Sequence, residues 1–171
     1  ISLAYLIMYV PKLNYIQSRI FSFFNRDTGT HNFQSDKAIE SITSGGYFGK
    51  GIGEGTLKNR VPEAHTDYII SVISEEFGVV AIMLILLLFL MFIYMVFKKI
   101  NYEKNDKTKL VLIGCVSLIL MQATIHVGVN IRLFPTTGMT LPFLSYGGSS
   151  IVSISILSGI ILNLTKRKIE N

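Results

Sequence analysis

A single aspartate stands where a long apolar part of the chain begins. The motif Pro62-Glu63-Ala64-His65-Thr66-Asp67-Tyr68 leads into residues 77–97, which carry no charge. Charge is costly inside a bilayer, so an acid at the mouth of a membrane helix indicates a functional site. A carboxylate can accept a proton from a reacting group, which makes Asp67 the first candidate for chemistry. The alternative is that Asp67 is only a helix-terminal carboxylate, favoured by the helix dipole.

A second block of small and polar residues lies further along the chain. It runs from Pro135 to Pro142 and continues as Ser145-Tyr146-Gly147-Gly148-Ser149-Ser150. Small residues allow close helix packing and also leave the backbone open to a substrate, so both interpretations stay open. We expect this block at the same membrane face as Asp67, one hairpin later. The two blocks predict a site built between helices at the membrane surface.

The elements that must position this site are membrane helices. Residues 77–97, 110–131 and 133–165 lack charge, and each run exceeds the roughly 20 residues that cross a bilayer. Half of the 171 residues are apolar and 16 % are charged, against about 25 % charged in soluble domains. The fold class predicted is all-α: a polytopic membrane protein with three complete transmembrane helices, the end of a fourth, and a long external loop containing short helices.

The basic residues are unevenly distributed along the chain. Five lysines fall in residues 98–109 and three basic residues follow the last run at 166–168, whereas the loop at 131–142 carries only Arg132. Positive charge marks cytoplasmic loops. The net charge of +5 therefore reflects topology, and nucleic acid is not expected as a partner.

One membrane domain is predicted over residues 1–171. Its expected parts are the end of a span (1–10), an external loop (11–67), spans at 68–97, 110–130 and 144–164, a cytoplasmic loop (98–109) and an external loop (131–142). The segment 1–10 is too short to span, so we expect a fragment of a longer protein. Residues 14–24 predict an interfacial helix, and residues 33–44 a short helix stopped by Gly45 and Gly46.

Six glycines lie between Gly45 and Gly55. They predict tight turns that let the backbone approach a ligand. A nucleotide-binding loop is excluded, because Ser44 and Gly51 break its pattern. A glycine-rich external loop near lipid phosphate remains the expectation.

A long helix is predicted from Thr66 to Lys99, with Thr66 as its N-cap. At about 50 Å it exceeds the bilayer core, so it must tilt or project. In the next span, Gln122, His126 and Asn130 share one helical face. Polar contacts between helices are the favoured interpretation of that stripe, and a substrate role is the alternative.

Several ordered motifs resemble those of the SEDS family (shape, elongation, division and sporulation), bacterial membrane proteins that polymerise peptidoglycan from lipid II. Ala64 is typical of the division members, whereas His126 and Arg132 depart from the family pattern. The resemblance covers nearly the whole chain and suggests the C-terminal portion of a member. The motifs are Gln34, residues 41–46, 49–53, 62–67 and 75–78, and residues 134–150.

The resemblance implies a peptidoglycan glycosyltransferase on the outer face of the membrane during division. Asp67 matches a proposed catalytic aspartate and is expected to act as general base, with polyprenyl pyrophosphate as the leaving group. Lys50, Lys58 and Arg60 are the candidates for contacting that pyrophosphate. The metal site is unknown, and a divalent cation stays open. The remaining substrate-binding candidates are Glu63, His65, Glu75, Ser145, Gly147 and Gly148. Glu75 is expected to line the cavity or to pair with a cation on a helix outside this chain.

The expected partners are lipid II, a class B penicillin-binding protein transpeptidase, other division proteins and membrane lipid. The expected location is the bacterial cytoplasmic (inner) membrane, with multiple spans and a cytoplasmic C-terminus. A lipid II flippase or transporter is one alternative function, and a non-catalytic division-site scaffold is another. The chain alone is expected to be inactive.

Overall fold

The structure is a computed structural model that describes residues 30–61 and 64–166. Within those residues every regular element is a helix, which confirms the all-α prediction. The elements are α3 (Thr30–Gly45), α4 (Leu57–Arg60), α5 (Ile69–Tyr102), α6 (Asp106–Asn130) and α7 (Gly148–Thr165). The predicted span end at 1–10 and the predicted interfacial helix at 14–24 lie outside the described residues. So does Glu63.

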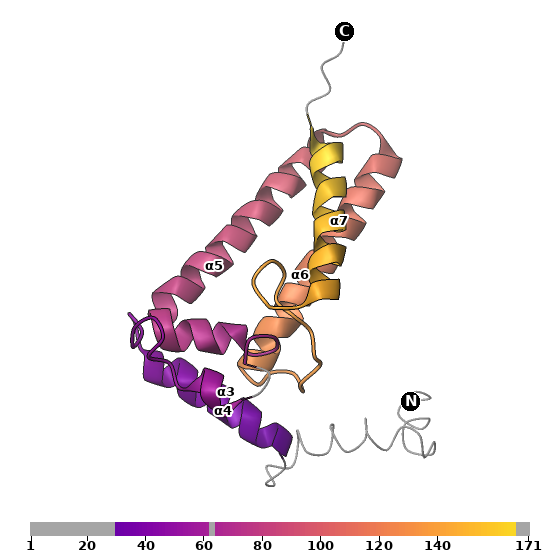
Figure 1. Cartoon of the computed structure of the whole chain (residues 1–171). Coiled ribbons are helices and arrows are strands. Elements are labelled where there is room, and N and C mark those ends of the chain that lie inside the picture. Colours follow the sequence, from indigo (N-terminus) through magenta and orange to yellow (C-terminus); the bar gives the residue numbers. More distant parts are fainter. Residues whose placement is uncertain (1–29, 62–63, 167–171) are drawn as a thin grey trace, which may run out of the picture.

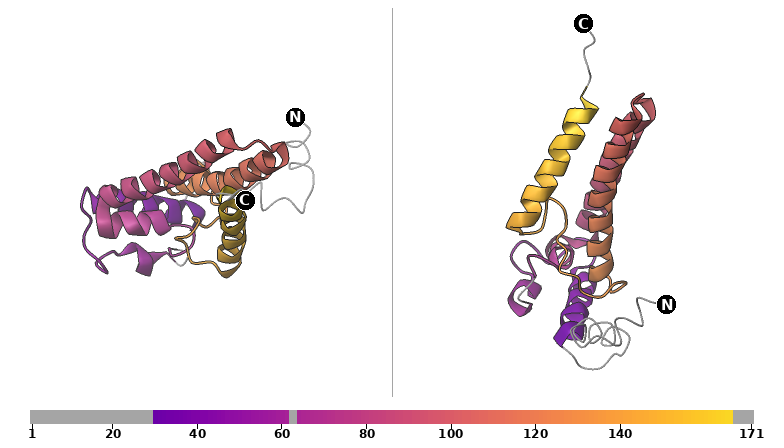
Figure 2. Two further views of the ribbon diagram at one scale, coloured as in Figure 1. Left: turned by 90° about the horizontal axis from the view of Figure 1, so that it is seen from above. Right: turned by 90° about the vertical axis from the view of Figure 1, so that its right-hand side faces the viewer.

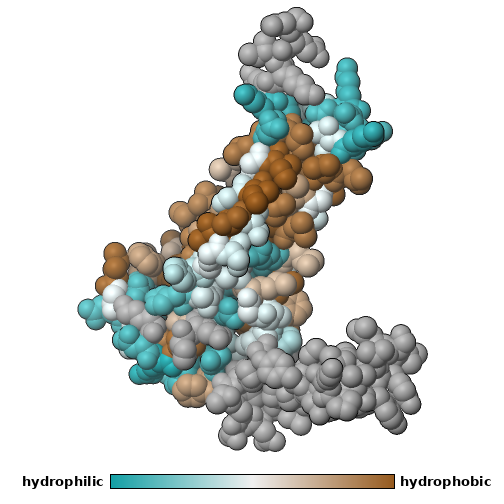
Figure 3. Space-filling model, turned by 45° about the vertical axis from the view of Figure 1, so that its right-hand side comes forward, coloured by the Kyte–Doolittle hydropathy of each residue, from teal (hydrophilic) through white to brown (hydrophobic). Residues whose placement is uncertain are grey.

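Three of these helices, α5, α6 and α7, are long and apolar enough to cross a membrane. In Figure 1 the end of α5, the start of α6 and the end of α7 lie together at one end of the molecule. Helices α3 and α4 and the loop before α7 gather at the opposite end, as Figure 2 also shows. Figure 3 shows brown apolar surface between two hydrophilic ends, the pattern expected of a protein that crosses a bilayer.

Two buried clusters hold the helices together. The first joins α5, α6 and α7 through Val96, Ile100, Leu112, Cys115, Val116, Ile119, Ile154 and Ile161. Its free cysteine, Cys115, is a buried core residue. The second joins α3, α4, the start of α5 and the end of α6 through Ala38, Leu57, Val61, Ala64, Tyr68, Val72 and Val129. This second cluster surrounds the turn that carries Asp67.

The prediction of one continuous helix from Thr66 to Lys99 is wrong in two respects. The helix begins at Ile69 with Tyr68 as its N-cap residue, so Thr66 lies in the preceding turn. The backbone also leaves the helical region at Gly78, where φ is +80°. A side chain there would put Cβ 2.2 Å from the carbonyl oxygen of Tyr47, so only glycine fits. The segment before the break therefore runs across the end of the molecule, and only the segment after it spans (Figure 1).

The glycine-rich loop at residues 46–51, here called the glycine clip, satisfies the backbone groups around this break. Four hydrogen bonds join the clip to α5. On the far side of the break, Val79 N–H donates to Gly46 O (2.9 Å) and Val80 N–H to Tyr47 O (3.3 Å). On the near side, Lys50 N–H donates to Glu75 O (2.9 Å) and Gly51 N–H to Glu76 O (3.0 Å). A helix break in a membrane protein is tolerated where neighbouring groups supply such partners. The sequence predicts that these glycines let the backbone approach a ligand, and in the structure they let the clip approach the backbone of α5.

Helix α3 ends where the sequence predicts its end, directly before the clip. Helix α3 ends at Gly45, and Gly46 follows with φ of +58°. Glycine in this left-handed conformation is a common helix terminator. The short helix predicted over residues 33–44 is therefore confirmed and slightly extended.

Candidate functional site

Asp67 lies in the turn that precedes α5, and its side chain is almost buried, at 8 % exposed. The loop before α7 passes close to its carboxylate: a Cβ added to Gly138 would lie 3.9 Å from Asp67 Oδ2. The two blocks of residues that the sequence predicted to share a site therefore meet in space.

The end of α6 fixes the backbone of this turn through Asn130, which is fully buried. Its Nδ2 donates to Asp67 O at 2.9 Å and to His126 O at 2.9 Å. Its Oδ1 accepts from Ser71 N–H at 3.2 Å and from Ser71 Oγ at 2.8 Å. Together these bonds use the full hydrogen-bonding capacity of the amide. Asn130 consequently ties α6 to both sides of the helix start that carries Asp67.

The loop before α7 fixes the same turn from the other side. Ser145 Oγ donates to Thr66 O at 2.8 Å and accepts from Leu141 N–H at 2.8 Å. The Tyr146 N–H donates to His65 O at 3.1 Å. The Ser145 side chain is buried at 4 % exposed, so it packs between segments here, whereas the His65 side chain is exposed. Substrate contact by either residue stays a prediction.

The polar stripe on α6 binds other segments, as the favoured interpretation predicted. Gln122 Nε2 donates to Thr140 O at 2.9 Å and to Ser150 Oγ at 3.3 Å. His126 Nδ1 lies 2.8 Å from Met139 O. Because these contacts reach Met139, Thr140 and Ser150, the stripe holds the loop before α7 and the first turn of α7 against α6.

A hollow of about 470 Å³ opens between α6, α7 and this loop. We call it the α6–α7 hollow. Its polar wall consists of Gln122, Thr140, Ser149, Ser150 and Ser153, and Gly138 and Gly147 also line it. Gly138 is thus shared between the hollow and the surroundings of Asp67. The predicted neighbour Gly148 faces open space, since a Cβ there would meet no atom within 4 Å.

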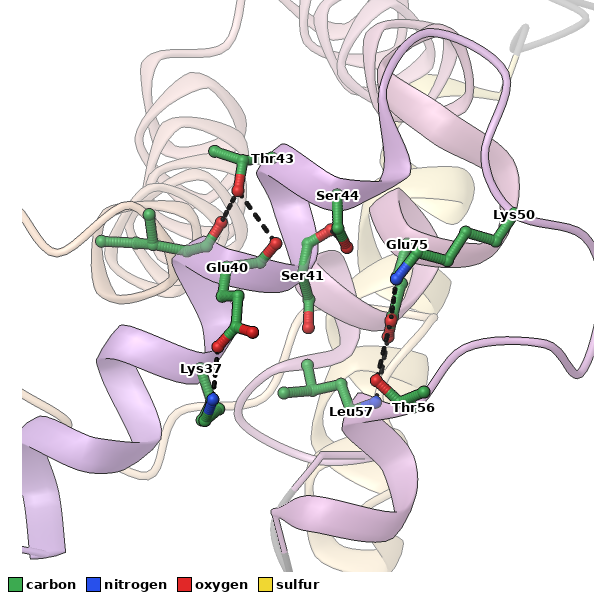
Figure 4. A network of polar contacts seen from close by, with 10 residues as sticks. Lys37, Glu40, Ser41, Thr43, Ser44, Lys50, Thr56, Leu57 and Glu75 are labelled. Carbon is green, nitrogen blue, oxygen red and sulfur yellow. Dashed lines mark hydrogen bonds and ion pairs between the residues drawn. The ribbon is translucent and has the colours of Figure 1, made fainter.

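A second cavity, here called the polar pocket, lies between α3, α4 and α5 and measures about 170 Å³. Figure 4 shows Glu75, one of its lining residues, between Lys50 and Thr56. The Glu75 carboxylate accepts from Lys50 Nζ at 2.9 Å, Thr56 Oγ at 3.1 Å and Leu57 N–H at 3.0 Å. Of the two expectations for Glu75, the structure agrees with the first, because Glu75 lines this pocket, and within the described residues its carboxylate pairs with a lysine of this chain. Its partner is Lys50, because the glycine clip brings that lysine back over α5.

The polar pocket carries a small excess of positive charge. Its charged lining consists of Lys37, Lys50, Arg60, Glu40 and Glu75. Lys37 pairs with Glu40, and this hydrogen bond and charge hold the pKa of the Glu40 carboxyl below its usual value. Lys50 remains partly accessible, with 37 % of its side chain exposed. Cationic and hydroxyl groups grouped in this way suit an anionic, oxygen-rich ligand.

Two further basic residues singled out from the sequence are Lys58 and Arg132. The side chain of Lys58 is outside the described residues. Arg132 pairs with Asp36 and so links the turn after α6 to α3. In residues 30–61 and 64–166 there is no group of three His, Cys, Asp or Glu side chains that could hold a metal ion. The contact that sequence reasoning missed is that of Asn130 with Asp67, although the shared helical face of residues 122, 126 and 130 pointed to it.

Three membrane-length helices with a carboxylate turn at one end define a multi-pass membrane protein with its candidate site at a membrane face. Residues 1–170 match the family of FtsW, RodA and SpoVE, described as "Cell cycle protein". The chain belongs to this family.

Similar proteins include several named "Probable peptidoglycan glycosyltransferase FtsW". The one from Enterococcus hirae is 34 % identical, and the alignment covers 99 % of this chain and 45 % of the relative. The one from Caulobacter vibrioides is 37 % identical over 91 % of this chain and 40 % of the relative. The chain therefore spans less than half the length of these curated relatives.

A solved chain has a similar fold. It comes from a structure described as "Structural coordination of polymerization and crosslinking by a peptidoglycan synthase complex". The TM-score is 0.67 at 25 % sequence identity, with coverage of 96 % of this chain and 46 % of that one.

Proposed function

We propose that this chain is part of a peptidoglycan glycosyltransferase that polymerises lipid II, with Asp67 as general base. The observation that supports this most strongly is the position of Asp67 Oδ2 beside Gly138, which lines the hydroxyl-bearing α6–α7 hollow. A sugar entering that hollow would bring its hydroxyls toward the carboxylate. The names of the relatives support the same reaction class.

In the proposed reaction, a hydroxyl of one lipid-linked sugar attacks the anomeric carbon of another. Asp67 takes the hydroxyl proton as the new C–O bond forms. The bond between the anomeric carbon and the polyprenyl pyrophosphate breaks, and the pyrophosphate leaves with the electron pair. Proton acceptance by a positioned carboxylate typically contributes about 10²–10⁴ in rate.

The polar pocket is the proposed place for the pyrophosphate. Lys50 and Arg60 line it, and Lys58 is a third candidate from the same segment. Glu75 orients the Lys50 ammonium, so a phosphate oxygen would meet a cation that is already held in place. Glu63, His65, Ser145, Gly147 and Gly148 remain proposed substrate contacts around the two cavities.

The proposed setting follows from the family and from the charge pattern. Residues 1–171 form one membrane domain whose C-terminus is cytoplasmic, and the site faces the opposite side. A class B penicillin-binding protein transpeptidase is the proposed partner, because a similar fold occurs in a structure described as a peptidoglycan synthase complex. Other division proteins are proposed further partners.

The test compares Asp67→Asn with Asp36→Asn, a matched change at an exposed aspartate that pairs with Arg132. Each variant is built into a chimera that supplies the remaining part of a relative, reconstituted in vesicles and given lipid II. Glycan strands are then resolved by gel electrophoresis. We expect strands from wild type and Asp36→Asn and none from Asp67→Asn. Strands of normal yield from Asp67→Asn would refute the proposal.

A further inference from the structure

The glycine clip and the residue that follows it carry three large, highly exposed side chains. Tyr47 is 77 % exposed, Phe48 87 % and Ile52 81 %. Neighbouring exposed apolar side chains of this kind mark an interaction surface. We propose that these three residues, here called the clip tip, insert into the interfacial layer of the lipid bilayer and fix the depth at which α5 enters the membrane.

The hydrogen bonds of the clip set the level of its tip. Glu75 and Glu76 are the last charged residues before the charge-free run that begins at Phe77. Lys50 N–H donates to Glu75 O, and Tyr47 O accepts from Val80 N–H. The tip is therefore held at the height where the α5 surface changes from charged to apolar, and this is the height of the membrane interface.

The chemistry of the tip suits that height. Tyrosine, with its apolar ring and polar hydroxyl, is enriched where headgroups meet hydrocarbon. Phenylalanine and isoleucine gain free energy when their apolar surface leaves water. The one charge within the clip, Lys50, reaches inward to Glu75 (Figure 4), so it does not oppose insertion of the tip.

The position of the tip favours lipid as the occupant. Figure 1 shows the clip at the edge of the molecule, at the bend of α5 and on the side away from α6 and α7. The apolar surface continues from there along α5, where Val80 is 53 % and Met83 62 % exposed. The clip tip thus continues the exposed apolar surface of the spanning part of α5 beyond the break.

The chain has no tryptophan, so one introduced indole reports its own surroundings. The decisive variant is Phe48→Trp, in the full chain reconstituted in phosphatidylcholine vesicles with or without brominated acyl chains. Phe33→Trp is the aqueous control, because Phe33 is a half-exposed aromatic residue of α3 (54 %). Leu90→Trp is the lipid control, because Leu90 lies within the apolar run of α5 and is 67 % exposed. Ile52→Trp repeats the test at a second tip position, and circular dichroism verifies that each variant is helical.

We expect blue-shifted emission and strong quenching by brominated lipid at residues 48, 52 and 90, with little of either at residue 33. Bromines near the headgroup should quench residue 48 more than residue 90, and bromines near the chain ends should do the reverse. Emission like that of indole in water, quenched by acrylamide alone, would overturn the proposal. So would blue-shifted emission that brominated lipid leaves unquenched, since it would show burial against protein.

Discussion

The Asn130 amide fixes both the backbone of Asp67 and the first turn of α5. It is fully buried, and all four of its hydrogen-bonding positions are occupied. Any replacement that lacks the amide leaves buried backbone groups of Asp67, Ser71 and His126 without this partner. The position of the proposed base therefore depends on a residue of another helix.

Asn130→Ala should lower the free energy of unfolding by about 1–3 kcal/mol, the cost of unsatisfied buried polar groups. It should also reduce strand synthesis, because the Asp67 turn loses its anchor. Thr124→Ala is the matched control, since Thr124 is an exposed residue of α6 whose hydroxyl donates to Leu120 O within the same helix. Thermal unfolding in detergent and strand synthesis measure the two effects. Equal loss of synthesis in both variants would contradict a specific role for Asn130.

Glu75→Gln should destabilise the protein by about 2 kcal/mol, the scale of hydrogen bonds to a charged group. The change keeps the shape of the side chain and removes the charge that holds Lys50. Glu40→Gln is the control, because its pair with Lys37 lies on the exposed surface and such pairs add little stability. Unfolding midpoints measure both. An unchanged midpoint for Glu75→Gln would show that Glu75 does not hold the clip.

At the residue level the sequence predicted which segments lie close together around Asp67, and the roles of the site residues stay predictions. It placed Asp67 near the block at 135–150 and put residues 122, 126 and 130 on one helical face. It did not predict the Lys50–Glu75 pair, because the two residues are 25 positions apart and the glycine clip is what brings Lys50 back over α5. The periodicity of a helix reveals which side chains share a face, whereas it does not reveal which loop covers that face.

At the level of the elements, the break in α5 determines where the site lies. The four hydrogen bonds of the glycine clip replace those that the helix loses around Gly78. The segment before the break can therefore lie across the end of the bundle, where α3 and α6 pack on it. A straight helix would carry the same residues away from Asn130.

Gly78→Ala should be strongly destabilising, since the new Cβ would lie 2.2 Å from Tyr47 O at a φ of +80°. Gly114→Ala in α6 is the matched control, because a Cβ there meets no atom within 4 Å. That control should be neutral or stabilise the helix by about 0.5–1 kcal/mol. Thermal unfolding and the rate of proteolysis at residues 45–57 measure both variants. Slow proteolysis and a normal midpoint for Gly78→Ala would contradict the account of the break.

The sequence predicted the existence of α3, α5, α6 and α7, because apolar run length and glycine stops are local signals. It did not predict the break, because Gly78 lies inside a charge-free run and a single glycine does not by itself end a helix. The hydrogen-bond partners that make the break stable are 25 to 33 positions away along the chain. The same distance explains why the glycine motif was interpreted as a ligand loop.

At the level of the whole molecule, the two polar ends of the bundle should lie on opposite sides of the membrane. Cys115 is the only cysteine and is buried, so introduced cysteines can be labelled selectively. In right-side-out vesicles, a membrane-impermeant maleimide should label Glu54→Cys directly and Lys107→Cys only after lysis. Both positions are exposed. The reverse pattern would place the Asp67 turn on the cytoplasmic side and contradict the proposed polymerase.

The most direct measurement of the role of Asp67 separates binding from reaction. Lipid II binding and single-turnover strand formation are measured on the same reconstituted chimera with Asp or Asn at position 67. A general base predicts unchanged binding and a rate lower by about 10²–10⁴ for Asp67→Asn. Equal rates for the two proteins at equal binding would contradict the account.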